Sequence, residues 1–304
     1  MHKEVIVLLH GGGLSWWNYK EAAEALQKDY RIILPILDGH AGSNRPFTTI
    51  ADNAAEIISF IDTHLGGSVL LIGGLSLGGQ IALEILSQRK NVCKCAIIES
   101  ALVIPSRFTY SMIKPAFGSC YGFIQHEWFS KLQFKSLKMK AELFDDYFKD
   151  SCAIAKKDMI AFLQENSVYS LKDSVKNCMA RVYIFVGSKE NRIMRKSSAI
   201  IHQSLQNSLM QVLPGLYHGE FSINHGKDYA KMIKSEHDKY VIKQYGDYKV
   251  PFLFATNGRD YIKQYEEMSG IWFLDTRQSF NCSRALAGWP SPQGVEQDLE
   301  RDIA

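Results

Sequence analysis

A serine stands in a sequence pattern that suits nucleophilic catalysis. Residues 74–78 are Gly-Leu-Ser-Leu-Gly, with Ser76 at the centre. The run Ser68–Gly73 before it is short and apolar, as in a buried strand, and the run Gly79–Leu86 after it has apolar residues at helical spacing. Glycines on either side of a serine permit a strained turn between strand and helix, which leaves the hydroxyl exposed. The pattern predicts that Ser76 is a nucleophile; the alternative is an ordinary serine in a glycine-rich turn.

The elements that would hold this turn alternate along the first two thirds of the chain. Short, almost continuously apolar runs are separated by amphipathic helical patterns, which favours a parallel sheet covered on both faces. The expected strands are residues 4–9, Arg31–Pro35, Ser68–Gly73, Cys95–Glu99, Arg181–Gly187 and Leu209–Leu213, and the expected helices between them are Tyr19–Lys28, Ala51–His64, Gly79–Gln88 and Ser197–Gln206.

The composition excludes several classes of protein. The 304 residues suffice for one large domain and a small second module, and 46% hydrophobic with 22% charged residues is ordinary for a globular protein. A net charge of +3 is too small to indicate a nucleic-acid-binding protein. No apolar run is long enough to span a membrane, and a strand from residue 4 leaves no room for a signal peptide. The six cysteines lie without a Cys-x-x-Cys pair or a histidine cluster, so we expect reduced thiols, no metal or other cofactor, and a cytoplasmic location.

One interval breaks the alternation of strands and helices. Residues 101–179 show helical patterns, many aromatic side chains and no convincing strand. We interpret this interval as a helical lid inserted into the α/β domain, because a lid needs an apolar underside to close over a substrate. The alternative is a set of additional core helices, which would be equally apolar.

Residues 1 to about 233 together resemble the α/β-hydrolase family. The stretch His10–Gly13 follows the first expected strand, as the family's oxyanion loop does. Residues 38–43 (Asp-Gly-His-Ala-Gly-Ser) follow the second strand and resemble the family's Asp-x-x-Gly-His-Gly-x-Ser turn, and the Ser76 motif follows the third. The resemblance implies an α/β-hydrolase fold: a mainly parallel sheet with helices on both faces and a helical lid at the family's cap position. The family usually has one or two antiparallel strands before its oxyanion strand, whereas only three residues precede that strand here.

The resemblance also implies which residues would assist Ser76. A serine hydroxyl needs a base, and the family's chain order is Ser, acid, His. The acid should follow the fifth strand, in the turn 187–191, where Glu190 is the only carboxylate; most family members have Asp there, and the alternative is a solvated loop glutamate. The base should follow the last strand, where His218 stands in a Gly-x-x-His-Gly context, with His225 as its one competitor.

An oxyanion hole would complete this set. The family implies that the backbone N–H of Leu77, together with an N–H from Gly12 or Gly13, would bind the developing alkoxide. Two such donors contribute about 3–4 kcal/mol each, and glycines suit the loop because a side chain would keep the backbone away from the substrate oxygen. A phosphate-binding loop is the competing interpretation, but neither Gly-x-x-x-x-Gly-Lys-Ser/Thr nor Gly-x-Gly-x-x-Gly is present.

The α/β-hydrolase pattern is complete before the C-terminal segment, residues 236–304, begins. A helix at Asp228–Lys234 would complete an α/β-hydrolase domain at residues 1–235, which leaves a small appendage at residues 236–304. Residues of about 240–300 resemble a fragment of the R subunit of type I restriction enzymes, from the end of its nuclease domain. The clustered carboxylates of a metal-dependent nuclease are missing, so we interpret this segment as non-catalytic. The resemblance lies in residues 249–259, 269–277 and 284–292.

Two apolar runs of this segment, Val250–Ala255 and Ile271–Leu274, are expected to be strands. Outside a larger sheet, they would form at most a small hairpin or rest on the hydrolase surface.

These patterns predict a serine hydrolase that cleaves a small carboxylic ester or a related acyl compound. Ser76 would attack, His218 would relay the proton and Glu190 would orient His218. The same triad also serves thioesters and C–C bonds, and the fold does not decide among them. Two other classes stay open: a binding protein that retains the pocket, which an intact triad opposes, and a component of DNA restriction. We expect a small-molecule acyl substrate and no membrane partner; nucleic acid would bind only through the C-terminal segment, and the sequence does not indicate the oligomeric state.

Overall fold

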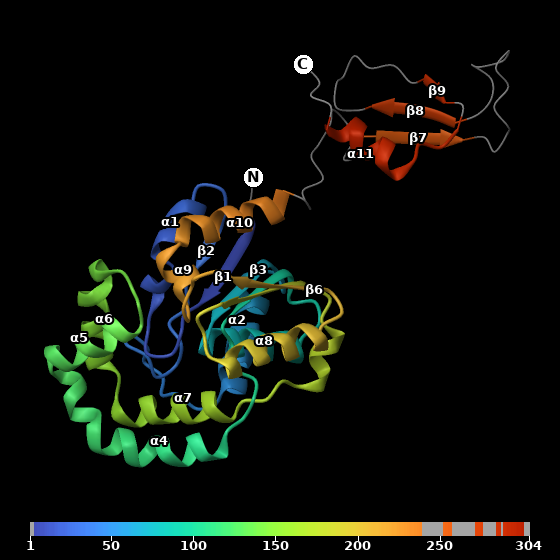
Figure 1. Cartoon of the computed structure of the whole chain (residues 1–304). Helices are drawn as coiled ribbons and strands as arrows, with labels where there is room; N and C mark the ends of the chain where they lie inside the picture. Colours follow the sequence, from blue (N-terminus) through green and yellow to red (C-terminus); the bar gives the residue numbers. More distant parts are fainter. Residues whose placement is uncertain (1–2, 239–251, 257–270, 276–283, 287, 301–304) are drawn as a thin grey trace. The chain divides into compact units, whose positions relative to one another are not determined.

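A parallel sheet of six strands forms the centre of the first of two structural units. The computed structural model describes residues 3–238, 252–256, 271–275, 284–286 and 288–300 (Figure 1). The chain divides into the units Met1–Met232 and Ile233–Ala304. In the first unit the strand order is β2-β1-β3-β4-β5-β6, and all neighbouring strands are parallel. The strands are β1 (Val5–Leu9), β2 (Arg31–Ile33), β3 (Val69–Leu75), β4 (Cys93–Glu99), β5 (Arg181–Gly187) and β6 (Ser208–Leu213).

This strand order has a switch point between β1 and β3. The chain leaves β1 toward β2 on one side and then returns to build β3, β4, β5 and β6 on the other. The loops that follow β1 and β3 therefore run to opposite faces and leave a crevice at the carboxyl ends of the strands, where ligands of open α/β sheets bind.

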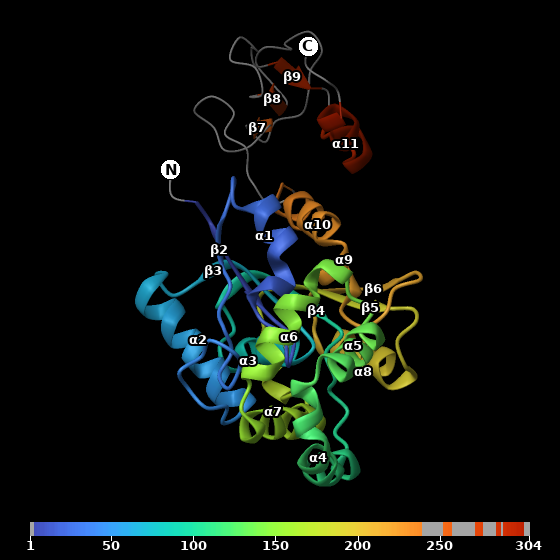
Figure 2. The same cartoon turned by 90° about the vertical axis from the view of Figure 1, so that its left-hand side faces the viewer.

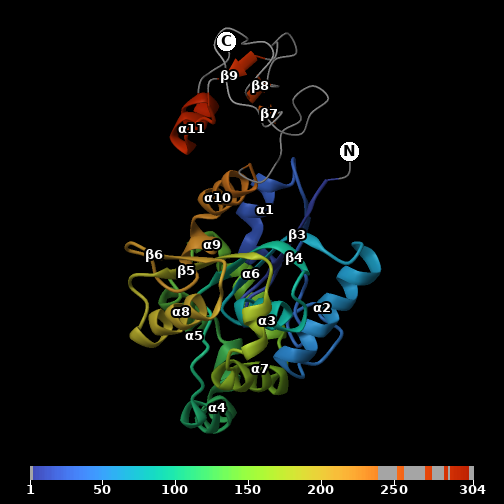
Figure 3. The ribbon, with the colours of Figure 1, turned by 90° about the vertical axis from the view of Figure 1, so that its right-hand side faces the viewer.

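Helices cover both faces of the sheet. α1 (Lys20–Leu26) and α10 (Gly226–Asp238) lie side by side on one face, and α2 (Ile50–His64), α3 (Leu77–Gln88) and α8 (Arg192–Ser204) cover the other (Figure 3). Successive residues of a strand point to opposite faces, so a strand covered on both sides is apolar throughout. β3 illustrates this, because all seven of its residues are buried. The predicted fold class is confirmed.

The insert (residues 101–179) consists of helices and contains no strand. α4 and α7 lie side by side, and all four α-helices gather at one end of the sheet (Figures 1 and 2). Some of its side chains, such as Phe162, join the main core, while Phe108 is 77% exposed and Trp128 63%. The insert is therefore neither wholly core nor wholly surface. Its α-helices are α4 (Arg107–Cys120), α5 (Glu127–Ser136), α6 (Phe144–Ala153) and α7 (Lys156–Val168).

The second unit contains a small antiparallel sheet. β7 (Phe252–Thr256) pairs with β8 (Ile271–Asp275), and β8 pairs with β9 (Arg284–Leu286). A helix, α11 (Pro292–Glu300), follows. The unit thus has a third strand and a helix beyond the expected hairpin, and the first residues of the expected strand Val250–Ala255 lie outside the described part of the chain.

Two helix boundaries differ from the sequence expectation by four residues or more, and the other expected helix ends lie within two residues of the observed ones. α8 begins at Arg192 rather than Ser197, because the Asn191 side chain accepts the Met194 N–H at 2.9 Å and caps the helix. α10 continues to Asp238, beyond the end expected for the helix and for the hydrolase domain. The domain boundary at residue 235 stays a prediction.

Four cysteines with described side chains have free thiols. Cys93 and Cys95 are buried and Cys152 and Cys178 are half-buried, and none of the four is in a disulfide. Cys282 lies outside the described residues. None of the described helices combines the length and the apolar character that crossing a membrane requires.

Candidate active site

β3 ends in a tight turn that presents Ser76. Ser76 has φ +52° and ψ −110°, which is rare for a residue other than glycine, and it immediately precedes α3. A Cβ at Gly74 would lie 2.2 Å from the Gly78 carbonyl oxygen, and a Cβ at Gly78 would lie 2.1 Å from the Leu9 carbonyl oxygen. The N–H of Ser76 donates to the carbonyl of Glu99 at 2.9 Å, which ties the turn to β4. A strained backbone of this kind is typical of functional sites.

His218 and Glu190 form a hydrogen-bonded pair. Nδ1 of His218 lies 2.8 Å from Oε2 of Glu190, and Oε1 of Glu190 accepts the Ser100 hydroxyl and the Gly187 N–H, each at 2.7 Å. Burial alone would raise the pKa of Glu190, but these hydrogen bonds, led by the one from His218, outweigh burial and hold the pKa below its usual value. Glu190 is therefore ionised at neutral pH. It fixes the ring of His218 and leaves Nε2 as the nitrogen available to a nucleophile.

The two loops that carry this pair touch each other. Glu190 follows β5 and His218 follows β6, which are neighbouring parallel strands. The Lys189 N–H donates to the Leu216 carbonyl at 3.0 Å. A Cβ at Gly187 would lie 2.2 Å from the same carbonyl oxygen, so the close approach of the acid loop to the base loop requires glycine there.

Ser100 is a support that the sequence patterns did not indicate. It directly follows β4, has φ +54° and donates its hydroxyl to Glu190. Its N–H donates to the Phe185 carbonyl at 2.9 Å. The one available signal is its position, because Ser100 directly follows β4, the neighbour of β5.

The glycine-rich loop after β1 is held by side chains from two other segments. Nε2 of His40 accepts the Gly13 N–H at 3.0 Å, and Oδ1 of Asn18 accepts the Gly11 N–H at 3.1 Å. Burial lowers the pKa of His40 to about 4, so the ring is neutral near pH 7 and Nε2 can accept. Nδ1 of His40 lies 3.0 Å from the Asp38 carbonyl oxygen, which assigns the ring proton to Nδ1.

His10, like His40, supports the backbone through both of its ring nitrogens. Its Nε2 accepts the Leu37 N–H at 3.1 Å, and its Nδ1 lies 2.9 Å from the Gly11 carbonyl oxygen. Burial, reinforced by the nearby His40, lowers the pKa of His10 to about 3. Both histidines are neutral, and each accepts a backbone N–H and so supports the loop structure rather than acting as a base.

The two expected oxyanion donors of this loop differ in their surroundings. The Gly13 N–H donates to His40, whereas the described residues provide no acceptor for the Gly12 N–H. A Cβ at Gly12 would lie 3.5 Å from Cβ of Leu77, so Gly12 faces the start of α3. Leu77 is the first residue of that helix, where N–H groups have no partner within the helix.

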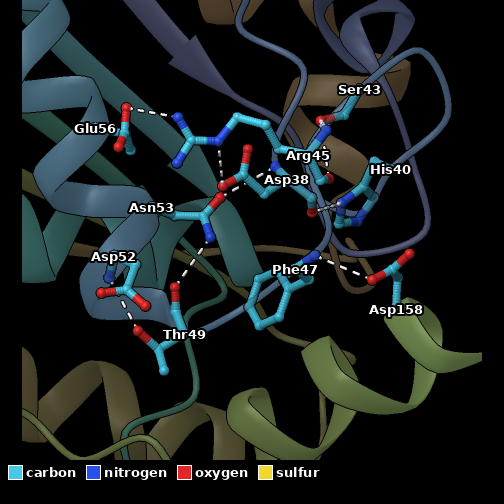
Figure 4. Close-up of polar contacts among 10 residues, drawn as sticks. All are labelled: Asp38, His40, Ser43, Arg45, Phe47, Thr49, Asp52, Asn53, Glu56 and Asp158. Carbon is cyan, nitrogen blue, oxygen red and sulfur yellow. Dashed lines mark hydrogen bonds and ion pairs between the residues drawn. The ribbon is translucent and has the colours of Figure 1, made fainter.

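The turn after β2, which carries Asp38, His40 and Arg45, also contacts α2 and the insert (Figure 4). Arg45 lies between Asp38 and Glu56, with nitrogen–oxygen distances of 3.5 and 2.9 Å. From α7, Oδ1 of Asp158 accepts the Phe47 N–H at 3.1 Å. The turn is thus bonded to α2 on one side and to the insert on the other.

A cavity of about 290 Å³ joins these groups to the insert. Ser76, His218 and the loop 11–13 line it from the sheet side. His225 does not line it and lies between α9 (Glu220–Asn224) and α10. The insert contributes mostly apolar side chains, with a few polar ones: Phe117, Ile124, Gln133, Leu137, Met139, Tyr147, Ser151, Met159, Phe162 and Leu163.

The described residues show no hydrogen bond between the Ser76 hydroxyl and His218, although both line the cavity. In sites without substrate such bonds are often long and tighten in the complex. Within the described residues, no group of three or more His, Cys, Asp or Glu side chains is placed to hold a metal ion.

The C-terminal part of the chain is similar to a restriction enzyme. The sequence profile described as "Type I restriction enzyme EcoKI endonuclease subunit second domain" matches residues 198–299, starting within α8 and earlier than the expected residue of about 240. The EcoKI endonuclease subunit of Escherichia coli (strain K12) is 44% identical over 52 residues, which cover 17% of this chain and 4% of that protein.

The first unit is similar to known hydrolases. A soluble epoxide hydrolase from Corynebacterium sp. (strain C12) is 33% identical over 82 residues, 25% of this chain and 27% of that protein, so the chain spans under a third of either curated relative. A thermophilic esterase from Thermogutta terrifontis superimposes with a TM-score of 0.65 at 16% identity, covering 78% of this chain and 90% of that one. The enol-lactonase from Burkholderia xenovorans LB400 gives 0.66 at 13%, covering 78% and 92%.

The family profile extends over most of the chain. The profile described as "Alpha/beta hydrolase family" matches residues 6–231, which include the whole six-stranded sheet, the strained turn at Ser76 and the loop of His218. The chain belongs to the alpha/beta hydrolase family.

Proposed function

We propose that this protein is a serine hydrolase that cleaves a small carboxylic ester or a related acyl compound. The observation that carries the proposal is the placement of Ser76 and His218 on the wall of one cavity, with Glu190 hydrogen-bonded to His218 behind it. A nucleophile, a base and an orienting acid are the groups that acyl transfer requires.

In the proposed mechanism, Nε2 of His218 takes the proton of Ser76 as the serine oxygen attacks the acyl carbon. The N–H groups of Gly12 and Leu77 bind the oxyanion, and each such donor contributes about 3–4 kcal/mol. Gly13 was an equal candidate from the sequence, but its N–H donates to His40, so we assign it to holding the loop. Glu190 stabilises the imidazolium that forms, and His218 gives the proton to the leaving oxygen or sulfur as its bond to the acyl carbon breaks. A water molecule, deprotonated by His218, then attacks the acyl carbon, and Ser76 takes the proton back as its own bond to that carbon breaks.

We assign the insert the role of a lid that receives the acyl group. Most of the side chains that it contributes to the cavity are apolar, and it contributes no charged side chain. Burying an uncharged alkyl chain there is favourable by about 0.8 kcal/mol for each CH₂ group, whereas an unpaired charge would lose its hydration. The preferred acyl group is therefore uncharged and apolar.

Hydrolysis of p-nitrophenyl esters, from acetyl to dodecanoyl, and of matched thioesters tests the proposal on wild type and Ser76→Ala. Ser76→Ala should lower kcat/KM by more than about 10³-fold at an unchanged Tm, because only the nucleophile is removed. Ser87→Ala is the matched control, because Ser87 lies on α3 and donates its hydroxyl to the Leu83 carbonyl, away from the cavity. Retention of more than about a tenth of the activity in Ser76→Ala would refute the assignment.

We assign the hydrolase to residues 1–235 and treat residues 236–304 as a non-catalytic appendage. Tyr229 and Ile233 of α10 are buried, and the helix runs to Asp238, so a shortened chain should end at residue 238. Ester hydrolysis should survive this truncation. Unfolding or loss of activity would show that the C-terminal segment belongs to the hydrolase, and binding of duplex DNA by the full chain but not by the shortened one would favour a restriction role.

A further inference from the structure

A second cavity shares His218 with the cavity of Ser76. Its volume is about 230 Å³, and His218 and Leu137 are the two residues that line both spaces. The ring of His218 therefore stands at the boundary between two cavities, one that contains the nucleophile and one that does not.

The wall of the second cavity is rich in hydrogen-bond donors. Lys189 is exposed there and has no ion pair among the described residues. Oδ1 of Asn191 is occupied by the Met194 N–H, which leaves the side-chain amide to donate. Tyr217 adds a hydroxyl, and Nζ of Lys138 lies 5.6 Å from the centre of its ring, so a second cation is close.

The carboxylates around this cavity are already engaged. Glu190 accepts hydrogen bonds from His218, Ser100 and Gly187. Glu220 accepts the Tyr217 N–H at 2.8 Å and the Asn224 side-chain amide at 3.3 Å. The groups that remain available to a ligand are thus mainly donors and the cation of Lys189.

The proposed acyl transfer requires space for the leaving group of the substrate beside His218. When the Ser76 oxygen forms its bond to the acyl carbon, the bond from that carbon to the leaving oxygen or sulfur must break. The leaving atom then takes the proton that His218 removed from Ser76, so the leaving group has to lie beside the ring of His218. With the acyl group in the apolar cavity and the leaving atom at Nε2 of His218, the rest of the leaving group can extend past the ring of His218 into the second cavity.

We propose that the second cavity binds the leaving group of the substrate and that this group carries a carboxylate or a phosphate recognised by Lys189. The inference rests on the proposed function, because only an acyl-transfer reaction divides its substrate at His218. The substrate would have an apolar acyl part and an anionic alcohol or thiol part.

Two matched substrate pairs test this proposal and distinguish the two anions. The first pair is 2-nitrophenyl hexanoate and 3-hexanoyloxy-4-nitrobenzoate, which differ by one carboxylate. The second is S-hexanoyl pantetheine and S-hexanoyl 4′-phosphopantetheine, which differ by one phosphate. The measured quantity is the ratio of kcat/KM for the anionic over the neutral member, at low and high salt, in wild type, Lys189→Gln and Lys189→Glu. Lys176→Gln, an exposed lysine of the insert outside both cavities, is the control.

The wild-type ratio should exceed one for at least one pair. It should fall about threefold to tenfold in Lys189→Gln and further in Lys189→Glu, as expected for one charge pair near the surface. The effect should shrink at high salt, and Lys176→Gln should keep the wild-type ratio. Equal ratios in wild type and Lys189→Glu at low salt would overturn the leaving-group site. Such a result with hydrolysis still dependent on Ser76 would leave the proposed function intact, whereas hydrolysis that survives Ser76→Ala would refute the function itself.

Discussion

Hydrogen bonds position the candidate site residues at the ends of the strands, whereas apolar contacts dominate where the insert lines the cavity. At the ends of the strands, Glu190 accepts three hydrogen bonds, Ser76 is tied to β4, and Gly187 allows two loops to touch. The insert instead meets the cavity with apolar side chains and leaves others, such as Phe108, open to solvent. Directional bonds hold a group at one position, whereas apolar contacts are non-directional and tolerate repacking.

The difference suggests separate roles for the two regions: the strand ends position the reacting groups, and the insert selects the substrate. The proposed acyl transfer needs atoms fixed within a few tenths of an ångström, and the hydrogen-bonded loops can provide such positions. Fitting a particular acyl chain needs a wall whose shape can vary without disturbing those atoms. Substitutions at the strand ends should therefore lower kcat, and substitutions in the insert should change which substrate is preferred.

The largest effect is expected from His218→Ala. Loss of the base should lower kcat for p-nitrophenyl esters by on the order of 10⁵-fold. The side chain of His218 is 42% exposed, so the fold should persist, and circular dichroism would check this. His225→Ala is the matched control and should keep near-wild-type activity. The opposite ranking of the two variants would show that the wrong histidine has been chosen.

A smaller loss is expected from Glu190→Gln. An amide cannot stabilise the imidazolium, and its NH₂ group favours the wrong ring tautomer, so kcat should fall by on the order of 10³-fold. Glu190→Asp keeps the charge and should recover part of the loss. If Glu190→Gln retained wild-type kcat, Glu190 would be a structural carboxylate and not the orienting acid.

The pH dependence of the free energy of unfolding tests the buried environment of Glu99, the last residue of β4. Burial raises the pKa of Glu99 from its usual 4.5 to about 7, although the Ser222 N–H donates to Oε1 at 3.3 Å. Between these two values the folded state binds more protons than the unfolded state, so the free energy of unfolding falls as pH rises from about 4.5 to about 7.

Glu99→Gln removes this titration. Relative to wild type, the variant should gain up to about 3 kcal/mol of unfolding free energy at pH 8 compared with pH 4, measured by urea denaturation at both pH values. Glu24→Gln, at an exposed position of α1, is the control and should show no such difference. A gain for Glu99→Gln that is the same at both pH values would mean that Glu99 does not titrate in this range.

The smallest effect is expected in the insert. Met159→Trp places a larger side chain in the wall of the cavity and should shift the preference toward shorter acyl chains by about tenfold in kcat/KM ratio. Phe108→Trp, at an exposed position outside the cavity, should leave the chain-length profile as it is. If Met159→Trp lowered kcat/KM equally for all chain lengths, Met159 would affect the reaction itself and would not select the acyl chain.

The fold could be predicted, and the main candidate site residues could be proposed, because their signals are local. Apolar runs mark the strands, and the short motifs around Ser76 and His218 mark two sharp turns. The supporting contacts could not be predicted in the same way. The hydrogen bond from Ser100 to Glu190 joins residues 90 positions apart, and the bond from Gly13 to His40 spans 27 positions. Only the folded chain shows that His40 occupies the Gly13 N–H.

Short elements were missed for a related reason. β9 has three residues, too few for an alternating pattern, and it is visible only through its pairing with β8. The start of α8 depends on a single capping residue, Asn191, rather than on apolar spacing.

Labelling with a fluorophosphonate probe tests the central claim most directly. An activated serine displaces the fluoride and forms a stable bond to phosphorus, so the labelled residue can be identified by peptide mass spectrometry. We predict one adduct on the peptide that contains Ser76, no adduct in Ser76→Ala, and much slower labelling in His218→Ala. An unlabelled wild-type protein, or an adduct on another serine such as Ser100, would contradict the assignment of Ser76 as the nucleophile.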